Sequence, residues 1–217
     1  MFVPHKITFH LDGTGVYYDP FEPLTLDGIL AAAFIPDEVY EHEEIGRDEP
    51  PYEVPLPLAQ WHVGDVWGWR ASALFPQGET AETLTYWRKR LRQDRIEITE
   101  GAPNLTNGIY RDWNMPLPKL LCRQMVAYCV TDREGRRDIR RQLDERIKYL
   151  GKKRAHGHGR IVGIEVEKCG EDFSTQRDGR LTRWMPREDG TRLVRPRPPY
   201  WNNVGRVACA EIGDPVS

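Results

Sequence analysis

The sequence predicts an α+β domain built on an RRM-like, or ferredoxin-like, antiparallel sheet. Residues 6–11 and 162–167 alternate apolar with polar side chains, as half-buried strands do. The apolar run of residues 120–130 is typical of a central strand, and apolar stripes with helical spacing occupy residues 26–34 and 139–150. These elements follow one another as strand, helix, insertion, strand, helix and strand, which is the order that this fold requires.

We expect all 217 residues to form one elaborated domain. Residues 1–60 and 118–170 would form the RRM-like core, with an insertion at 61–117 and a basic C-terminal extension at 171–217. The sequence has no apolar run of membrane-spanning length and no secretory signal, which predicts a cytoplasmic protein without a membrane partner. Its four cysteines form no CxxC pair, so neither a metal site nor a disulfide framework is expected.

The first predicted strand has Ile7, Phe9 and Leu11 on its apolar side. The helix that follows is expected to begin after Thr25, whose side chain can cap it, and to stop before Pro36. Its apolar stripe should face the sheet, and Asp27 favours the positive end of the helix dipole.

Tryptophans dominate the next segment, residues 59–74, which predicts one or two strands. Trp61, Trp67 and Trp69 are suited to stack on nucleic-acid bases, but packing in the core is the commoner use of such residues, and we favour it.

A second helix is expected from about Ala81 to Gln93, because Leu84, Trp87 and Leu91 recur on one side. The other side of this helix carries Arg88, Arg92 and Arg95. A face exposed to solvent is the simpler interpretation of these arginines. Because positive charges without carboxylate partners repel one another, we prefer contact with nucleic acid. Residues 101–118 are rich in asparagine, glycine and proline, which indicates an inserted arm or thumb.

The last predicted helix should begin at a capping box formed by Thr131 and Glu134. Ile139 and Leu143 belong to its buried stripe, and Gly151 would terminate it in the left-handed conformation.

A glycine-rich cationic loop follows this helix and enters a strand. Glycines allow a phosphate to approach the backbone amides closely, and the cations supply charge. The order helix, loop, strand fits neither a P-loop nor a dinucleotide fingerprint, so the loop points to a nucleic-acid backbone. Its candidate binding residues are Gly151, Lys152, Lys153, Arg154, His156, Gly157, His158, Gly159 and Arg160.

Charge divides the chain at Leu84. Residues 1–84 carry 3 basic and 15 acidic side chains, a net charge of −12, and the remainder carries 28 basic and 18 acidic side chains, a net charge of +10. The acidic segment Asp37–Glu53 is interpreted either as a surface for a basic partner subunit or as a solvated loop. Eight arginines between residues 175 and 206, interleaved with aromatic residues and prolines, suggest an extended arm for RNA or for another subunit.

The loop resembles the glycine-rich loop of the RAMP superfamily of CRISPR-associated proteins. The segments Lys6–Leu11, Glu22–Pro36 and Tyr110–Leu121 are similar to the Cas-five-like backbone subunit of type IV CRISPR effector complexes, and the resemblance extends to about Cys169. It implies a RAMP fold and a non-catalytic subunit that grips the 5′ handle of the crRNA and caps the backbone filament. Tyr110, Arg111 and Trp113 would then be RNA contacts on a thumb.

The resemblance also implies the partners: crRNA, the filament subunits, a large or Cas-eight-like subunit and, through the complex, target nucleic acid. Two alternatives stay open. Some relatives cut precursor crRNA without metal, and His156 and His158 with Lys152 or Lys153 are suitable acid, base and oxyanion-stabilising groups. The other alternative is an RRM-like domain that binds single-stranded nucleic acid outside CRISPR. No cofactor is expected.

Overall fold

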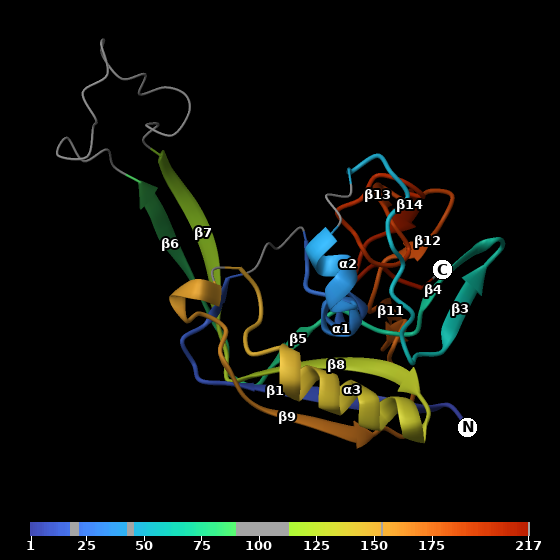
Figure 1. Cartoon of the computed structure of the whole chain (residues 1–217), viewed down its shortest axis with the longest axis horizontal. Coiled ribbons are helices and arrows are strands. Elements are labelled where there is room, and N and C mark those ends of the chain that lie inside the picture. The colour runs from blue at the N-terminus through green and yellow to red at the C-terminus, as the bar shows by residue number, and fades with distance from the viewer. Residues whose placement is uncertain (18–21, 43–45, 90–112, 153, 217) are drawn as a thin grey trace, which may run out of the picture.

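The computed structural model describes residues 1–17, 22–42, 46–89, 113–152 and 154–216 (Figure 1). Its central sheet has four strands in the order β5-β8-β1-β9, and each neighbouring pair is antiparallel. Two helices, α1 and α3, connect these strands as in a ferredoxin-like fold, so the α+β prediction is confirmed. The six elements are β1 (Val3–Leu11), α1 (Leu26–Phe34), β5 (Phe75–Gln77), β8 (Gln124–Thr131), α3 (Arg133–Arg146) and β9 (Ile161–Lys168).

The core lies between one face of this sheet and the two helices, which contact each other. Ile7 and Phe9 of β1 pair with Ala127 and Met125 of β8, and all four side chains are buried on that face. The apolar stripes of α1 and α3 cover them, with Leu26, Leu30, Ile139 and Leu143 fully buried. The periodicities seen in the sequence are therefore those of the core.

The helix ends follow the sequence prediction in α1 and depart from it at both ends of α3. The expectation that Gly151 terminates α3 is wrong: the helix ends at Arg146 with Ile147 as its C-cap, and Gly151, which does have the expected positive φ, lies in the loop that follows. Thr25 caps α1 by accepting a hydrogen bond from the Gly28 amide at 3.3 Å. Asp132 rather than Thr131 caps α3, accepting from the Gly135 amide at 2.8 Å. Thr131 is the last residue of β8, and its hydroxyl donates to the Pro57 carbonyl instead.

The helix predicted from Ala81 is wrong over the described residues, because β6 (Ala81–Lys89) is a strand that pairs with β7 (Trp113–Leu121). β-branched and aromatic residues favour this strand, and cross-strand pairing outweighs the helical spacing of Leu84 and Trp87. The hairpin protrudes from the body of the molecule, and the short strand β2 (Val16–Tyr17) extends its sheet at the base (Figure 1). We call this β6–β7 hairpin the arm.

Within the expected insertion at residues 61–117, residues 61–80 belong to the body. β3 (Gln60–Val63) and β4 (Val66–Trp69) form a hairpin, and β5 is an edge strand of the central sheet. Trp61 and Trp69 are buried, as expected for core packing.

The C-terminal region is a packed unit, which corrects the expectation of an extended arm. Arg183 is only 2 % exposed and donates hydrogen bonds to the carbonyls of Trp69, Ala71 and Pro196. The bonds to Trp69 and Ala71 fasten the region to the body, and the bond to Pro196 lies within the region. Its strands are β10 (Gln176–Arg177), β11 (Arg180–Leu181), β12 (Met185–Pro186), β13 (Arg192–Val194) and β14 (Val207–Ala210).

Part of the acidic segment Asp37–Glu53 has its partner within the chain. The Glu53 carboxylate pairs with Arg195 at 2.7 Å and with Arg197 at 2.9 Å. Asp37, the first residue of α2 (Asp37–His42), pairs with Arg146 at 2.8 Å. Within the ranges described above, no helix is long and apolar enough to cross a membrane.

Candidate nucleic-acid interface

The glycine-rich loop is folded against the turn that joins β1 to β2. The Lys152 amide donates to the Tyr17 carbonyl at 2.9 Å, and the Gly159 amide donates to the Gly15 carbonyl, also at 2.9 Å. The ends of the loop are closed by a bond from the Leu150 amide to the Gly159 carbonyl at 2.8 Å. The short 3-10 helix η3 (Arg154–His156) forms its tip. These bonds fix the position of the loop relative to β2.

Two of its glycines are required by this packing. Both have positive φ, +77° at Gly151 and +70° at Gly159. A Cβ atom would lie 2.3 Å from the Tyr17 carbonyl oxygen at Gly151 and 2.1 Å from the Leu150 carbonyl oxygen at Gly159. Gly157 also has positive φ, +81°, but a Cβ there would meet nothing within 4 Å.

Three of the loop amides are occupied by carbonyl groups of the protein itself. Those of Lys152 and Gly159 bind the β1–β2 side, and that of Gly157 donates to the Arg154 carbonyl at 2.9 Å. The expected close contact between these amides and a phosphate therefore has no free donor at these three positions. At these three positions a phosphate contact falls to the surrounding side chains.

The histidines join the loop to the arm through aromatic contacts. His156 meets Trp87 of β6 edge to face, with ring centroids 4.6 Å apart, and His158 meets Tyr17 in the same way at 4.6 Å. The Tyr17 hydroxyl accepts a hydrogen bond from Thr85 at 2.9 Å. Loop, β2 and the base of the arm thus form one surface.

Five cationic side chains belong to this surface or border it: Lys152, Arg154 and Arg160 in the loop, Lys119 on β7 and Arg123 before β8. Lys119 lies 5.6 Å from the centre of the Tyr17 ring. Arg123 donates to the Asp12 carbonyl at 3.3 Å. Arg160, at the end of the loop, is exposed and bonds to the same turn, since its carbonyl accepts from the Asp12 amide at 3.1 Å. We call Lys119, Arg123, Lys152, Arg154 and Arg160 the loop-side cations.

A carboxylate lies among these cations. Asp12 accepts hydrogen bonds from the amide and hydroxyl of Thr14, at 2.9 and 2.7 Å. The hydrogen bond from the Thr14 amide is the main cause that lowers the pKa of Asp12 below its ordinary value. The hydrogen bond from the Thr14 hydroxyl and the nearby Arg160 and Arg123 act in the same direction. Asp12 is therefore ionised at neutral pH and orders the turn that the loop packs against.

The other predicted contacts are not all on this surface. Arg88 alternates with Trp87 along β6 and so lies on the opposite face of the arm, where it donates to Asn114 at 3.1 Å. Trp113 is the first residue of β7. Five candidates lie outside the described residues: Arg92, Arg95, Tyr110, Arg111 and Lys153.

Sequence reasoning missed Tyr17, Lys119 and Arg123. The Asp-Gly-Thr-Gly run of residues 12–15 is a turn signal that marks where β1 ends, and it would have directed attention to this site. Arg123 was missed because the apolar run of residues 120–130 predicts a single strand that includes it. In the structure, β7 ends at Leu121 and β8 begins at Gln124, so Arg123 lies between two strands.

The described part of the chain contains no group of three or more His, Cys, Asp or Glu side chains that could hold a metal ion. All four cysteines are free, and Cys122, Cys129 and Cys209 are buried.

Comparison with known proteins completes this picture. The model of the family described as CRISPR type IV associated protein Csf3 matches residues 3–106 and 100–211. No curated protein matches the chain. Since the two matched ranges extend from the first strand of the sheet to the last strand of the C-terminal region, the chain belongs to the Csf3 family of type IV CRISPR-associated proteins.

Proposed function

We propose that this chain is the non-catalytic guide-RNA-binding subunit of a type IV CRISPR ribonucleoprotein complex, and that it grips the 5′ handle of the crRNA and caps the backbone filament. The observation that carries the proposal is the single surface made by the glycine-rich loop, the β1–β2 turn and the base of the arm, with its five loop-side cations. Cations on a preformed surface beside a protruding hairpin suit the backbone of a single-stranded RNA.

The opposite face of the central sheet is a poor alternative for RNA. RRM domains stack bases on exposed aromatic side chains of that face. Here Tyr128 occupies such a position but is only 7 % exposed, because Phe173 packs edge to face on it and Arg177 lies 5.8 Å from its ring centre. This cover favours the loop and the arm over the sheet as the place where RNA binds.

The non-catalytic assignment is supported by the surroundings of the two histidines. Both rings pack edge to face on aromatic rings, a position that serves to join loop and arm. General acid–base catalysis by a histidine needs a ring nitrogen within hydrogen-bond reach of the proton that it transfers. The alternative, a metal-independent endoribonuclease that processes precursor crRNA, uses the same two histidines and is decided by the experiment below.

The test is a binding and cleavage assay with repeat RNA in EDTA. The variant Lys152→Ala/Arg154→Ala/Arg160→Ala removes three loop-side cations. Arg133→Ala/Arg137→Ala/Lys168→Ala removes three exposed cations from α3 and β9 and serves as the charge-matched control. With about 0.7 counterions released per phosphate contact on a single strand, the loop variant should flatten the slope of log K against log salt by about 2, and the control should not.

The same assay contains the outcomes that oppose the proposal. Equal loss in both triple variants would show that binding follows net charge and not this surface. Specific cleavage in EDTA that is abolished in His156→Ala/His158→Ala, while RNA binding persists, would establish the endoribonuclease instead.

A further inference from the structure

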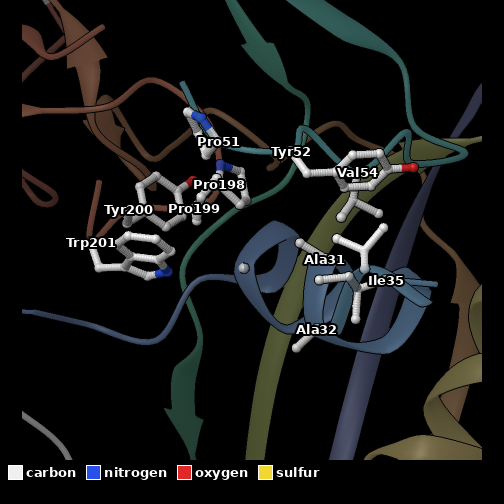
Figure 2. A pocket seen from close by; sticks show the side chains of 12 residues that line it. Ala31, Ala32, Ile35, Pro51, Tyr52, Val54, Pro198, Pro199, Tyr200 and Trp201 are labelled. Atoms are coloured by element: carbon white, nitrogen blue, oxygen red, sulfur yellow. The ribbon is translucent and has the colours of Figure 1, made fainter. Parts of the chain in front are cut away.

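An apolar groove lies on the side of α1 that is turned away from the sheet (Figure 2). Its volume is about 580 Å³. Gly28, Ala31 and Ala32 of α1 form its floor with Ile35, while Leu26, Leu30 and Ala33 of the same helix face the core. Figure 2 shows Tyr52 and Val54 beside Ala31 and Ile35, and the segment 198–201 across from them. The small residues of α1 make room for an occupant.

The walls are held in place by hydrogen bonds. The Tyr200 hydroxyl donates to the buried Asp27 carboxylate at 2.7 Å, and the Asn202 side chain donates to the Glu49 carbonyl at 2.8 Å. Glu53, between Tyr52 and Val54, is fixed by Arg195 and Arg197. A groove fixed in this way loses little conformational freedom when an occupant enters.

Two aromatic side chains of this groove remain open to water. Tyr52 is 39 % exposed and Trp201 is 48 % exposed. Exposed aromatic residues around an apolar hollow are typical of protein-binding sites, where they become the residues that contribute most to affinity.

Charge around the groove identifies the kind of occupant. The segment Asp37–Glu53, which supplies Val39, Pro51 and Tyr52 to the lining, contains eight acidic residues and one arginine. Asp37 and Glu38 precede Val39 on α2, and Asp48 and Glu49 precede Pro51; all four are exposed. Asp37 is paired with Arg146 and Asp48 accepts a hydrogen bond from Asn203, so Glu38 and Glu49 are the rim carboxylates that a cationic chain would meet first. Such a rim repels a phosphate backbone and attracts a cationic chain.

We propose that this groove binds a segment of another protein subunit of the complex, in which one or two large apolar side chains are flanked by lysine or arginine. The apolar side chains enter the hollow over Ala31 and Ala32, and the flanking cations meet the carboxylates of the rim. This inference rests on the proposed function only in taking the chain to be a subunit of a protein–RNA complex. The RNA surface formed by the loop-side cations is made of different residues.

The first test places a photo-reactive benzoylphenylalanine at position 31, which Figure 2 shows on the side of Tyr52 and Val54, in the full chain co-expressed with the other protein subunits of its complex and crRNA. The crosslinked peptide is then identified by mass spectrometry. A peptide of a companion subunit with lysine or arginine next to a large apolar residue is the expected result. A crosslink to RNA, to a second copy of this chain or to an acidic peptide overturns the proposal.

The second test measures assembly. Ala31→Trp fills the groove from a half-buried position of α1, and Glu38→Lys/Glu49→Lys reverses charge on its rim. Val162→Trp and Glu167→Lys/Glu171→Lys, at exposed positions on and after β9, are the matched controls. Each groove variant should weaken binding of one companion subunit at least tenfold, and the controls should not.

Repeat-RNA affinity of the isolated chain keeps the two proposals separate. It should be the same in Ala31→Trp as in the wild type, because Ala31 lies in the groove and not beside the glycine-rich loop. Undiminished subunit binding by folded Ala31→Trp and by the charge-reversal variant overturns the groove proposal, whatever the RNA affinity. Loss of RNA affinity in the loop-cation variant with intact subunit binding leaves the groove proposal unaffected.

Discussion

Replacing Arg183 by methionine is expected to destabilise the fold by about 3–5 kcal/mol, because it breaks a buried ion pair while leaving the other charge in place. Arg183 is 2 % exposed and Asp27 is fully buried, with 3.4 Å between the guanidinium nitrogen and the carboxylate oxygen. After the change, Asp27 would keep the Tyr200 hydroxyl and the Gly28 amide as donors, at 2.7 and 3.0 Å, but no cation.

The expected loss of stability also includes the three carbonyl groups that accept hydrogen bonds from Arg183. Trp69, Ala71 and Pro196 each lose a charged donor, and the guanidinium also lies 5.1 Å from the centre of the Trp61 ring. An unsatisfied buried acceptor costs roughly 1–3 kcal/mol, so each of the three carbonyls that water does not reach moves the loss toward the upper end of the stated range. Methionine retains much of the packing, so the loss reports chiefly the charge and the hydrogen bonds.

The assay is urea unfolding followed by tryptophan fluorescence, together with thermal melting. For a domain of this size the loss corresponds to a fall in Tm of roughly 6–20 °C. The double variant Arg183→Met/Asp27→Leu should lose less than the sum of the two single losses, since it leaves neither charge without its partner. A loss below about 1 kcal/mol for Arg183→Met, or strictly additive losses in the double variant, would refute the reasoning.

Three further outcomes are expected. Gly159→Ala should destabilise the loop and weaken RNA binding, because the added Cβ would lie 2.1 Å from a carbonyl oxygen. Gly157→Ala has open space around it and should cost only the strain of its positive φ. Thermal melting and RNA titration compare the two variants. Burial lowers the pKa of His5 below its ordinary value, so the unfolded chain binds more protons than the folded chain as the pH falls through about 6.5. The free energy of unfolding should therefore fall between pH 7.5 and 5.5. This fall should be smaller in His5→Gln. Arg123→Ala should weaken repeat-RNA binding and flatten its salt dependence by about 0.7, with little change in Tm; an unaltered slope would remove Arg123 from the interface.

Most of the core could be predicted from the sequence because its signals are local. The alternation through Ile7 and Phe9 and the stripe through Ile139 and Leu143 each need only one element to be recognised. Thr25 caps its helix as its position predicts. The order of these elements then suffices for a ferredoxin-like sheet.

What could not be predicted depends on pairing between distant segments. Leu84 and Trp87 fit a helix by spacing, but Ala81–Lys89 faces a partner strand at residues 113–121, and nothing local shows this. The candidate site also depends on contacts between distant segments, so the sequence alone does not reveal it. His156 and Trp87 are far apart in the sequence, and only the fold brings their rings together.

The structure also changes what the charge of the sequence means. The half of the chain after Leu84 has a net charge of +10, which by itself suggests an extensive surface for nucleic acid. In the C-terminal region, however, Arg195 and Arg197 pair with Glu53, Arg187 with Asp189, and Arg192 with Glu211. On α3, Arg140, Arg141 and Arg146 pair with acidic residues as well.

These arginines serve the fold, so the interface should be smaller than the net charge implies. Among the described residues, no ion pair within 4 Å joins Arg154 or Arg160 to a carboxylate, and both lie on the surface that the loop shares with the arm. If each of the five loop-side cations makes one phosphate contact, the salt dependence of RNA binding should have a slope of about −3.5. If all ten surplus charges took part, it would be about −7. A single salt titration of the isolated chain therefore decides whether RNA meets this localised surface or the whole basic half of the molecule.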